Sequence, residues 1–152
     1  MLNRRILYRG KRADSDAWVH GYYSGPVGPL NIHEIIDVDS GESVEVEPDT
    51  VSQFTGRLDC QSVMIFEDDI LRDAKGDGSK TFVVKFGRCG GVQNTDCEVG
   101  YVGFYVDPVG AWAQNHSSFG LRTDILYWLN SYHDMVVVGN IHDDPELVGE
   151  AT

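Results

Sequence analysis

The longest uninterrupted run of acidic side chains, Glu67-Asp68-Asp69, could bind a cation through its carboxylates. Oxygen atoms of this kind are the ligands that Mg²⁺ and Ca²⁺ prefer. In an extended strand, however, neighbouring side chains point to opposite faces, so only Glu67 and Asp69 could converge on one ion. Two carboxylates without a further ligand at a known spacing are too few. The sequence therefore predicts no metal site and no cofactor.

The histidines and cysteines do not form a recognisable reactive group either. The histidines lack the spacing of a preformed metal site, and together with the cysteines they match no zinc-binding pattern. Cys89 lies among glycines beside Arg88, where a reactive thiolate is one hypothesis and a tight glycine turn is the favoured one. Nucleophile-elbow, phosphate-loop and dinucleotide-binding motifs are missing from the sequence. We expect no catalytic residue, although this does not exclude an enzyme.

Three aromatic residues could instead line a groove for a small ligand such as a nucleotide. These are Trp18, Tyr22 and Trp112. Ligand grooves combine aromatic side chains with a few polar groups. Large aromatic residues are nevertheless more often part of an ordinary core, and that interpretation is favoured here.

The elements that must position these residues are mainly strands. Short segments rich in β-branched and aromatic residues, bounded by turn residues, predict about seven strands, at residues 6–8, 18–23, 30–38 (as an edge strand), 43–47, 81–86, 99–106 and 135–141. Helical spacing predicts one helix near residues 121–132, with Thr123 as its N-cap, and Pro145 suggests a terminal helical turn. We expect a small SH3-like barrel or β-sandwich lobe around residues 50–106, with the N-terminal strands and the C-terminal strand packed against it. One domain over residues 1–152 is expected, with two small lobes at about 1–48 and 49–152 as the alternative.

Composition and charge restrict the partners. The chain has 152 residues, of which 41% are hydrophobic and 24% charged, as in ordinary globular domains. No apolar run approaches the roughly 20 residues that span a bilayer. The basic N-terminus has no apolar segment behind it, and the odd number of cysteines argues against a disulfide scaffold, so a reducing cytoplasm is expected. The net charge of −12 disfavours direct nucleic-acid binding.

The charges are also unevenly distributed along the chain. Basic residues crowd the first twelve positions, whereas residues 34–49 carry only acidic ones. Two ordinary solvated faces would explain this pattern. The sharper alternatives are self-association of a basic edge with an acidic loop, or an acidic surface that acts as a decoy for a basic host protein.

Three ordered blocks resemble the YopX family of phage and prophage proteins. The first is Thr50-Val51-Ser52-Gln53-Phe54-Thr55-Gly56, followed by Leu58-Asp59 and by Ile65-Phe66-Glu67-Asp68-Asp69-Ile70. The second is Val138 to Leu147, which is similar to a C-terminal signature of that family. The third is the opening pair Ile6 to Lys11 and Trp18 to Tyr22. Agreement in three blocks at both ends and in the middle makes the resemblance specific.

The residues of the two signatures are better explained by architecture than by chemistry. Phe54, Leu58, Ile65, Phe66 and Ile70 are core candidates, and Asp59 begins a turn. Ser52, Ser62 and Asp68 stand where the family usually carries glycine. If those glycines serve left-handed turns, Ser62 and Asp68 must adopt that geometry or shift the turn. The motif positions that we expect to be structural are Thr50, Gln53, Phe54, Thr55, Gly56, Asp59, Ile65, Glu67, Asp69, Ile70, Gly139, Asn140, Pro145, Glu146 and Leu147.

The resemblance implies a phage or prophage accessory protein of unknown biochemical role in the bacterial cytoplasm. The favoured hypothesis is a non-catalytic binding or protein-interaction module that forms a homo-oligomer and binds an unknown host or phage protein. One alternative is a receptor or sponge for a small, nucleotide-like ligand. The other is an acidic decoy of a host DNA-binding protein.

Overall fold

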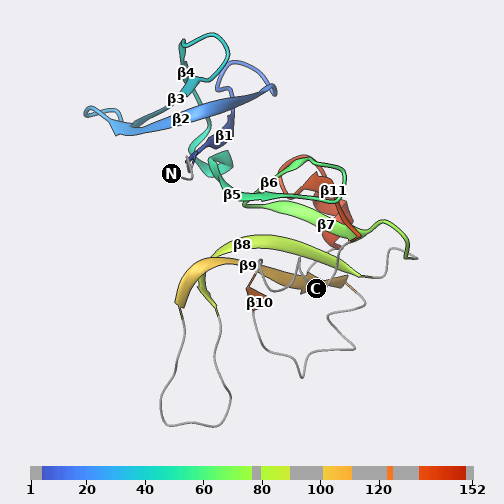
Figure 1. Ribbon diagram of the computed structural model, residues 1–152. Coiled ribbons are helices and arrows are strands. Elements are labelled where there is room, and N and C mark those ends of the chain that lie inside the picture. The colour runs from blue at the N-terminus through green and yellow to red at the C-terminus, as the bar shows by residue number, and fades with distance from the viewer. Residues whose placement is uncertain (1–4, 77–79, 90–100, 111–122, 125–133, 150–152) are drawn as a thin grey trace, which may run out of the picture. The chain divides into compact units, whose positions relative to one another are not determined.

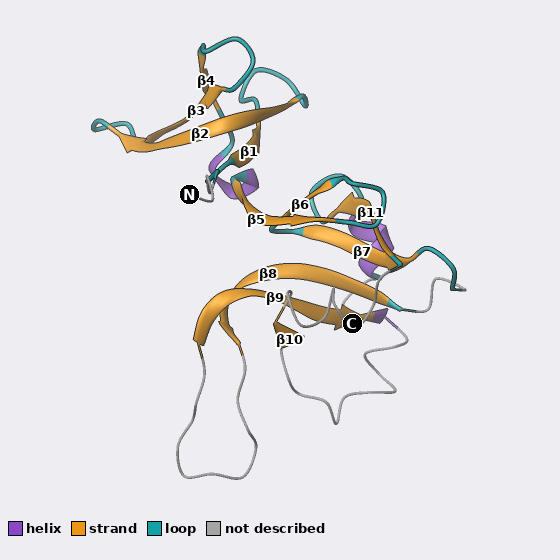
Figure 2. Ribbon diagram, viewed as in Figure 1, coloured by secondary structure: helices purple, strands orange, loops and turns teal. Residues whose placement is uncertain are grey.

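A computed structural model of the chain describes residues 5–76, 80–89, 101–110, 123–124 and 134–149. These residues are mainly strands joined by loops, with two short 3₁₀ turns (Figures 1 and 2). The chain divides into two compact units, which are unit 1, Met1–Arg57, and unit 2, Leu58–Thr152. The mainly β fold class that the sequence predicts is thereby confirmed.

Unit 1 is a curved antiparallel sheet. Its strands are β1 (Tyr8–Lys11), β2 (Trp18–Val27), β3 (Ile32–Asp37), β4 (Ser43–Glu45) and β5 (Ser52–Leu58), and the 3₁₀ turn η1 (Pro48–Thr50) precedes β5. Hydrogen bonds arrange them in the order β4-β3-β2-β1-β5. An isolated bridge between Arg12 and Val46 ties the end of β1 to the residue after β4, so the sheet curls.

Alternation along these strands produces the core of unit 1. Val19, Ile35, Val44 and Val46 are buried together, because every second side chain of a strand points to the same face. Gly21 in β2 leaves room for the neighbouring strand. A Cβ at this position would overlap the carbonyl oxygen of Ile36, so glycine is required by close approach and not by its φ angle.

Unit 2 is built on a second antiparallel sheet. Its elements are β6 (Met64–Phe66), β7 (Asp69–Asp73), β8 (Thr81–Cys89), β9 (Tyr101–Val109), β10 (Thr123–Asp124), β11 (Met135–Asn140) and the 3₁₀ turn η2 (Pro145–Val148). Hydrogen bonds give the order β10-β9-β8-β7-β11. The last strand, β11, therefore pairs with the early strand β7 (Figure 1), and the register shifts between Val137 and Gly139.

The core of unit 2 lies on one face of this sheet. Its members are Ile65, Leu71, Phe82, Val84, Val106 and Met135, each at most 3% exposed. Four strands of this sheet, β7, β8, β9 and β11, contribute to the core, and so does Ile65 of the separate strand β6. The motif segment around Ile65 is therefore anchored in the core. Leu58, a core candidate from the sequence, is instead 50% exposed and is not a core residue.

Several local expectations need correction. The described residues contain eleven strands and not about seven. Of the four additional strands, β5, β6 and β7 form within a segment whose turn residues conceal them, and the short β10 lies where a helix is predicted. Residues 32–37 are not an edge strand, since β3 lies between β2 and β4. Thr123–Asp124 form the strand β10, so these two residues of the helix predicted near 121–132 are extended, and the other residues of that helix lie outside the described residues. The described strands form no closed barrel and are consistent with a β-sandwich lobe.

The helical turn predicted at Pro145 is present as η2. The boundary between the units falls between Arg57 and Leu58, whereas the two-lobe alternative considered from the sequence divides the chain near residue 48. The reason is that η1 and β5 belong with the N-terminal strands, since β5 pairs with β1 through Ser52 and Gln53.

Candidate functional site

Two of the aromatic residues singled out from the sequence lie on the same face of unit 1. Trp18 and Tyr22 are four residues apart in β2, so both side chains point away from the face that carries Val19. We call this side the outer face of unit 1. It consists of the outward residues of four strands: Arg9, Lys11, Trp18, His20, Tyr22, Ser24, Glu34, Ile36, Ser43 and Glu45. Trp112 lies outside the described residues.

The Trp18 end of the outer face is cationic and largely covered. The guanidinium of Arg9 lies 4.8 Å from the centre of the Trp18 ring, and the Lys11 ammonium lies 5.8 Å from it. These distances are within cation–π range. Arg9 itself is only 8% exposed. The ring face of Trp18 is therefore engaged by the chain's own cations.

His20 lies between this cationic end and Tyr22. Burial lowers the pKa of His20, and the positive charge of Arg9 lowers it further, whereas Asp37 and Asp39 act in the opposite direction. The neutral imidazole is therefore favoured near neutral pH.

The centre of the outer face is apolar and exposed. Tyr22 and Ile36 are register partners in β2 and β3, and they are 51% and 41% exposed. The next row along β3 and β4 is acidic, because Glu34 lies directly opposite Glu45. The outer face thus changes from cationic through apolar to anionic across four strands.

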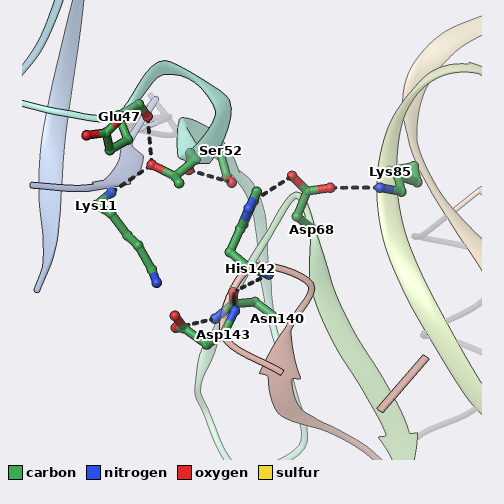
Figure 3. A network of polar contacts seen from close by, with 9 residues as sticks. Lys11, Glu47, Ser52, Asp68, Lys85, Asn140, His142 and Asp143 are labelled. Carbon is green, nitrogen blue, oxygen red and sulfur yellow. Dashed lines mark hydrogen bonds and ion pairs between the residues drawn. The ribbon is translucent and has the colours of Figure 1, made fainter. Parts of the chain in front are cut away.

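The signature residues at η1 hold backbone groups together. The Thr50 hydroxyl accepts the Lys11 N–H at 2.9 Å and donates to the Glu47 carbonyl at 2.7 Å. The fully buried Ser52 hydroxyl donates to the Thr50 carbonyl at 3.2 Å (Figure 3). These hydroxyls fix the turn that leads into β5, which is a structural role.

β5 holds the remaining signature residues of unit 1, which are Gln53, Phe54, Thr55 and Gly56. The backbone N–H of Phe54 donates to the Leu7 carbonyl at 2.8 Å. The Thr55 hydroxyl accepts the Arg57 N–H at 3.2 Å. Gly56 has φ +81°, in the left-handed region where glycine carries no Cβ penalty.

The Asp59 carboxylate organises two distant segments of unit 2. Its Oδ1 accepts the N–H groups of Gln61 at 2.8 Å and Val63 at 2.9 Å. Its Oδ2 accepts the N–H of Val137 in β11 at 2.9 Å. One carboxylate, 8% exposed, therefore satisfies three backbone donors. The turn predicted at Asp59 is present, and its bond to β11 is additional.

Asp69 plays a similar role at the start of β7. Its Oδ2 accepts the Phe66 N–H at 2.7 Å, and the residue is 1% exposed between the buried residues Ile65 and Ile70. Glu67, the other candidate cation ligand, is half-buried in the intervening turn. Across the described ranges of the chain, no group of three or more acidic, histidine or cysteine side chains is arranged to hold a metal ion.

The C-terminal signature is centred on the Asn140 side chain. Its Oδ1 accepts the N–H groups of His142 at 3.0 Å and Asp143 at 3.1 Å, while Nδ2 donates to the Asp143 carboxylate at 3.0 Å (Figure 3). The Asp144 carboxylate accepts the Asn140 N–H at 3.2 Å. A Cβ on Gly139 would overlap that carboxylate.

The same segment leads into η2. Pro145 occupies its first turn, and Glu146 places negative charge there. The Leu147 N–H donates to the Asp144 carbonyl at 3.0 Å. The second signature thus closes a turn after β11.

A family model described as YopX protein matches residues 8–149 of the chain. The chain belongs to the YopX family. No curated protein matches it. In this YopX-family chain the matched span contains both signatures and the outer face of unit 1. In the part that the structure describes, no helix is long and apolar enough to cross a membrane.

Two residues of this YopX-family chain that stand at expected glycine positions have a backbone conformation typical of glycine. Ser62 and Asp68 both have φ +66°. Both residues therefore have the left-handed geometry that a turn glycine adopts without a Cβ penalty, and asparagine and aspartate adopt it more readily than most other residues.

Asp68 also acquires contacts that glycine could not make. Its carboxylate accepts from Lys85 Nζ at 2.8 Å and lies 3.2 Å from His142 Nε2 (Figure 3). Two backbone hydrogen bonds, which glycine could also make, add to these side-chain contacts: the Asp68 N–H donates to the Val84 carbonyl at 2.8 Å, and the Asp68 carbonyl accepts the Ile141 N–H at 3.0 Å. Asp68 thus joins the β6–β7 turn, β8 and the segment after β11. The missing glycine is the one sign of this role in the sequence, which does not indicate Lys85 or His142 as partners.

Proposed function

We propose that this YopX-family chain is a non-catalytic protein-interaction module that binds its partner on the outer face of unit 1. The observation that carries the proposal is the exposed pair Tyr22 and Ile36 in the middle of that face. An aromatic and a branched aliphatic side chain side by side are typical of the anchors of protein interfaces. Complete burial of one such side chain contributes about 1.5–3 kcal/mol.

The use of the signature carboxylates supports a non-catalytic role. A general acid or base must come within hydrogen-bond reach of a substrate. Asp59 and Asp69 are 8% and 1% exposed, and their oxygens accept backbone N–H groups. Removing either would expose backbone donors of the fold and would not free a catalytic group.

The small-ligand alternative has less support. It relies on free aromatic ring faces, and the Trp18 ring is approached by Arg9 and Lys11. The homo-oligomeric state, the phage origin and the location in the bacterial cytoplasm remain part of the proposal, suggested by the family resemblance and by the uneven charge.

The test compares two double variants of the full chain in pull-downs from a bacterial lysate with quantitative mass spectrometry. Tyr22→Ser with Ile36→Ser removes the apolar centre of the outer face. Val27→Ser with Leu30→Ser is the matched control, because these residues are also exposed, at 45% and 80%, but lie at the β2–β3 connection. We expect the first pair to lose proteins that the wild type and the control retain. Retention of the same proteins by all three, or loss from both variants, would refute the proposal, provided that thermal unfolding shows all of them folded.

A further inference from the structure

In the part of the chain that the structure describes, two glutamates of the outer face lie opposite each other without a compensating cation. Glu34 and Glu45 are register partners in β3 and β4. The Val46 N–H donates to the His33 carbonyl, and the Asp37 N–H donates to the Glu42 carbonyl. Hydrogen-bonded and non-hydrogen-bonded pairs alternate along an antiparallel ladder, so Glu34 and Glu45 form the non-hydrogen-bonded kind, whose side chains lie closer together.

Such a pair destabilises the free protein. Cβ atoms of directly opposed residues are about 4.5–5.5 Å apart, and like charges at this separation repel. Among the described residues of unit 1, Lys11 pairs with Asp16 and Arg12 pairs with Asp14, and neither ion pair includes the two glutamates. A cation supplied from outside would remove the repulsion, so the pair favours a positively charged partner.

The acidic pair is adjacent to the apolar centre of the outer face. Ile36 follows Glu34 by two residues in β3, and Tyr22 pairs with Ile36. Two residues of a strand span about 7 Å. A partner segment must therefore place a cation and a large apolar side chain about 7 Å apart. An extended segment does so with residues i and i+2.

We propose that the outer face of unit 1 binds a basic amphipathic segment of a partner protein, with a cation between Glu34 and Glu45 and an apolar side chain on Tyr22 and Ile36. This inference rests on the proposed function and specifies its partner. Arginine suits the position best, because its planar fork can donate to two carboxylates at once. The negative pair would repel a nucleic-acid backbone.

A second copy of the chain is a poorer occupant. In a two-fold dimer formed through this face, the outer face of one copy would contact the outer face of the other. The positive groups that would have to compensate the glutamates are Arg9 and Lys11, and both are engaged with Trp18, with Arg9 only 8% exposed. The face is therefore not complementary to itself.

The experiment measures binding of a fluorescein-labelled peptide, RSFSRSFSR, to the full chain by fluorescence anisotropy. The comparison peptides are RSSSRSSSR, which lacks the apolar residues, and ESFSESFSE, which lacks the cations. The test variant is Glu34→Gln with Glu45→Gln. The control is Asp39→Asn with Glu42→Gln, which changes the net charge equally in the β3–β4 turn.

We expect the test variant to weaken binding of RSFSRSFSR about tenfold and the control to change it less than about twofold. Both comparison peptides should bind more weakly than RSFSRSFSR. The test variant should unfold at the same or a higher temperature than the wild type, because it removes the repulsion.

Three outcomes would overturn the inference. Equal weakening of peptide binding by both variants would indicate unspecific charge attraction. If RSFSRSFSR does not bind at all, a basic amphipathic segment is not the partner. A concentration-dependent dimer that the test variant abolishes would assign the face to a second copy. If the inference fails in any of these ways while Tyr22→Ser with Ile36→Ser still loses its lysate partners, the proposed function stands and only the chemistry of the partner is wrong.

Discussion

Replacement of Asp68 separates two opposing contributions at one position of unit 2. The side chain bonds to Lys85 and His142, but the backbone has φ +66°. Glycine relieves the backbone and loses both contacts, alanine loses both contacts without relief, and asparagine keeps a short side chain that tolerates the left-handed region. The free energies of unfolding of Asp68→Gly, Asp68→Ala and Asp68→Asn therefore report the two contributions independently.

The side-chain contacts of Asp68 contribute more to the free energy of unfolding than its backbone strain does. Asp68 and His142 are 16% and 18% exposed, so their contact contributes about 1.5 kcal/mol. Lys85 is 35% exposed, and its pair contributes about 1 kcal/mol or less because water screens it. Glycine recovers about 1–2 kcal/mol of backbone strain, about half of which is offset by the greater freedom of its unfolded chain, about 0.4–1 kcal/mol. We expect Asp68→Gly to lose about 1.5–2 kcal/mol, Asp68→Asn about 1 kcal/mol, and Asp68→Ala about 0.5–1 kcal/mol more than glycine.

Urea unfolding followed by tryptophan fluorescence measures these differences. Ser62→Gly is the matched control, because Ser62 has the same φ of +66° and replaces the same kind of family glycine, but its side chain is exposed. This control should be neutral or slightly stabilising. If Asp68→Gly behaves like Ser62→Gly, the contacts to Lys85 and His142 contribute nothing and the reasoning is refuted. Equal stability of Asp68→Gly and Asp68→Ala would contradict the left-handed backbone.

Three further substitutions test other parts of the structure. When the pH falls from about 7.5 to 5.5, the free energy of unfolding of His20→Gln should decrease less than that of the wild type. Burial lowers the pKa of His20, so below about pH 6.5 the unfolded wild-type chain binds more protons than the folded one, and the wild type loses stability. Urea unfolding at both pH values measures the two decreases, and equal decreases would contradict the prediction. Gly21→Ala should cost about 3 kcal/mol or more, because its Cβ overlaps the Ile36 carbonyl, and a circular-dichroism melt unchanged from the wild type would disprove that close approach. Asp59→Ala should cost about 3 kcal/mol and increase hydrogen exchange at Val63 and Val137, whose N–H groups lose their acceptor; protection that stays unchanged would refute the assigned role.

Local features of the fold could be predicted from the sequence where the pattern itself carries the geometry. Residues 43–47 alternate, and Val44 is indeed buried between exposed Ser43 and Glu45, because a period of two is a direct consequence of strand geometry. The same holds for the turn at Asp59, whose side chain bonds to backbone groups only a few residues away.

Contacts between distant segments could not be predicted in this way. Nothing near Asp59 identifies Val137 as its third donor, and nothing near Asp68 identifies Lys85 and His142 as partners. Likewise, Tyr22 could be selected as an aromatic candidate, but its pairing with Ile36 depends on the register of β2 against β3. A single sequence contains no signal for that register beyond the alternation of each strand.

The strand order of unit 2 has a consequence for the chain as it leaves the ribosome. β7 is flanked by β8 and β11, and β11 is the last strand among the described residues (Figure 1). Until residues 135–140 are synthesised, one side of β7 exposes unpaired N–H and C=O groups, and such an open edge can pair with other chains. Unit 1 can bury its core earlier, because Val19, Ile35, Val44 and Val46 all precede residue 58. A chain shortened before Met135 should therefore aggregate through unit 2 while unit 1 still folds.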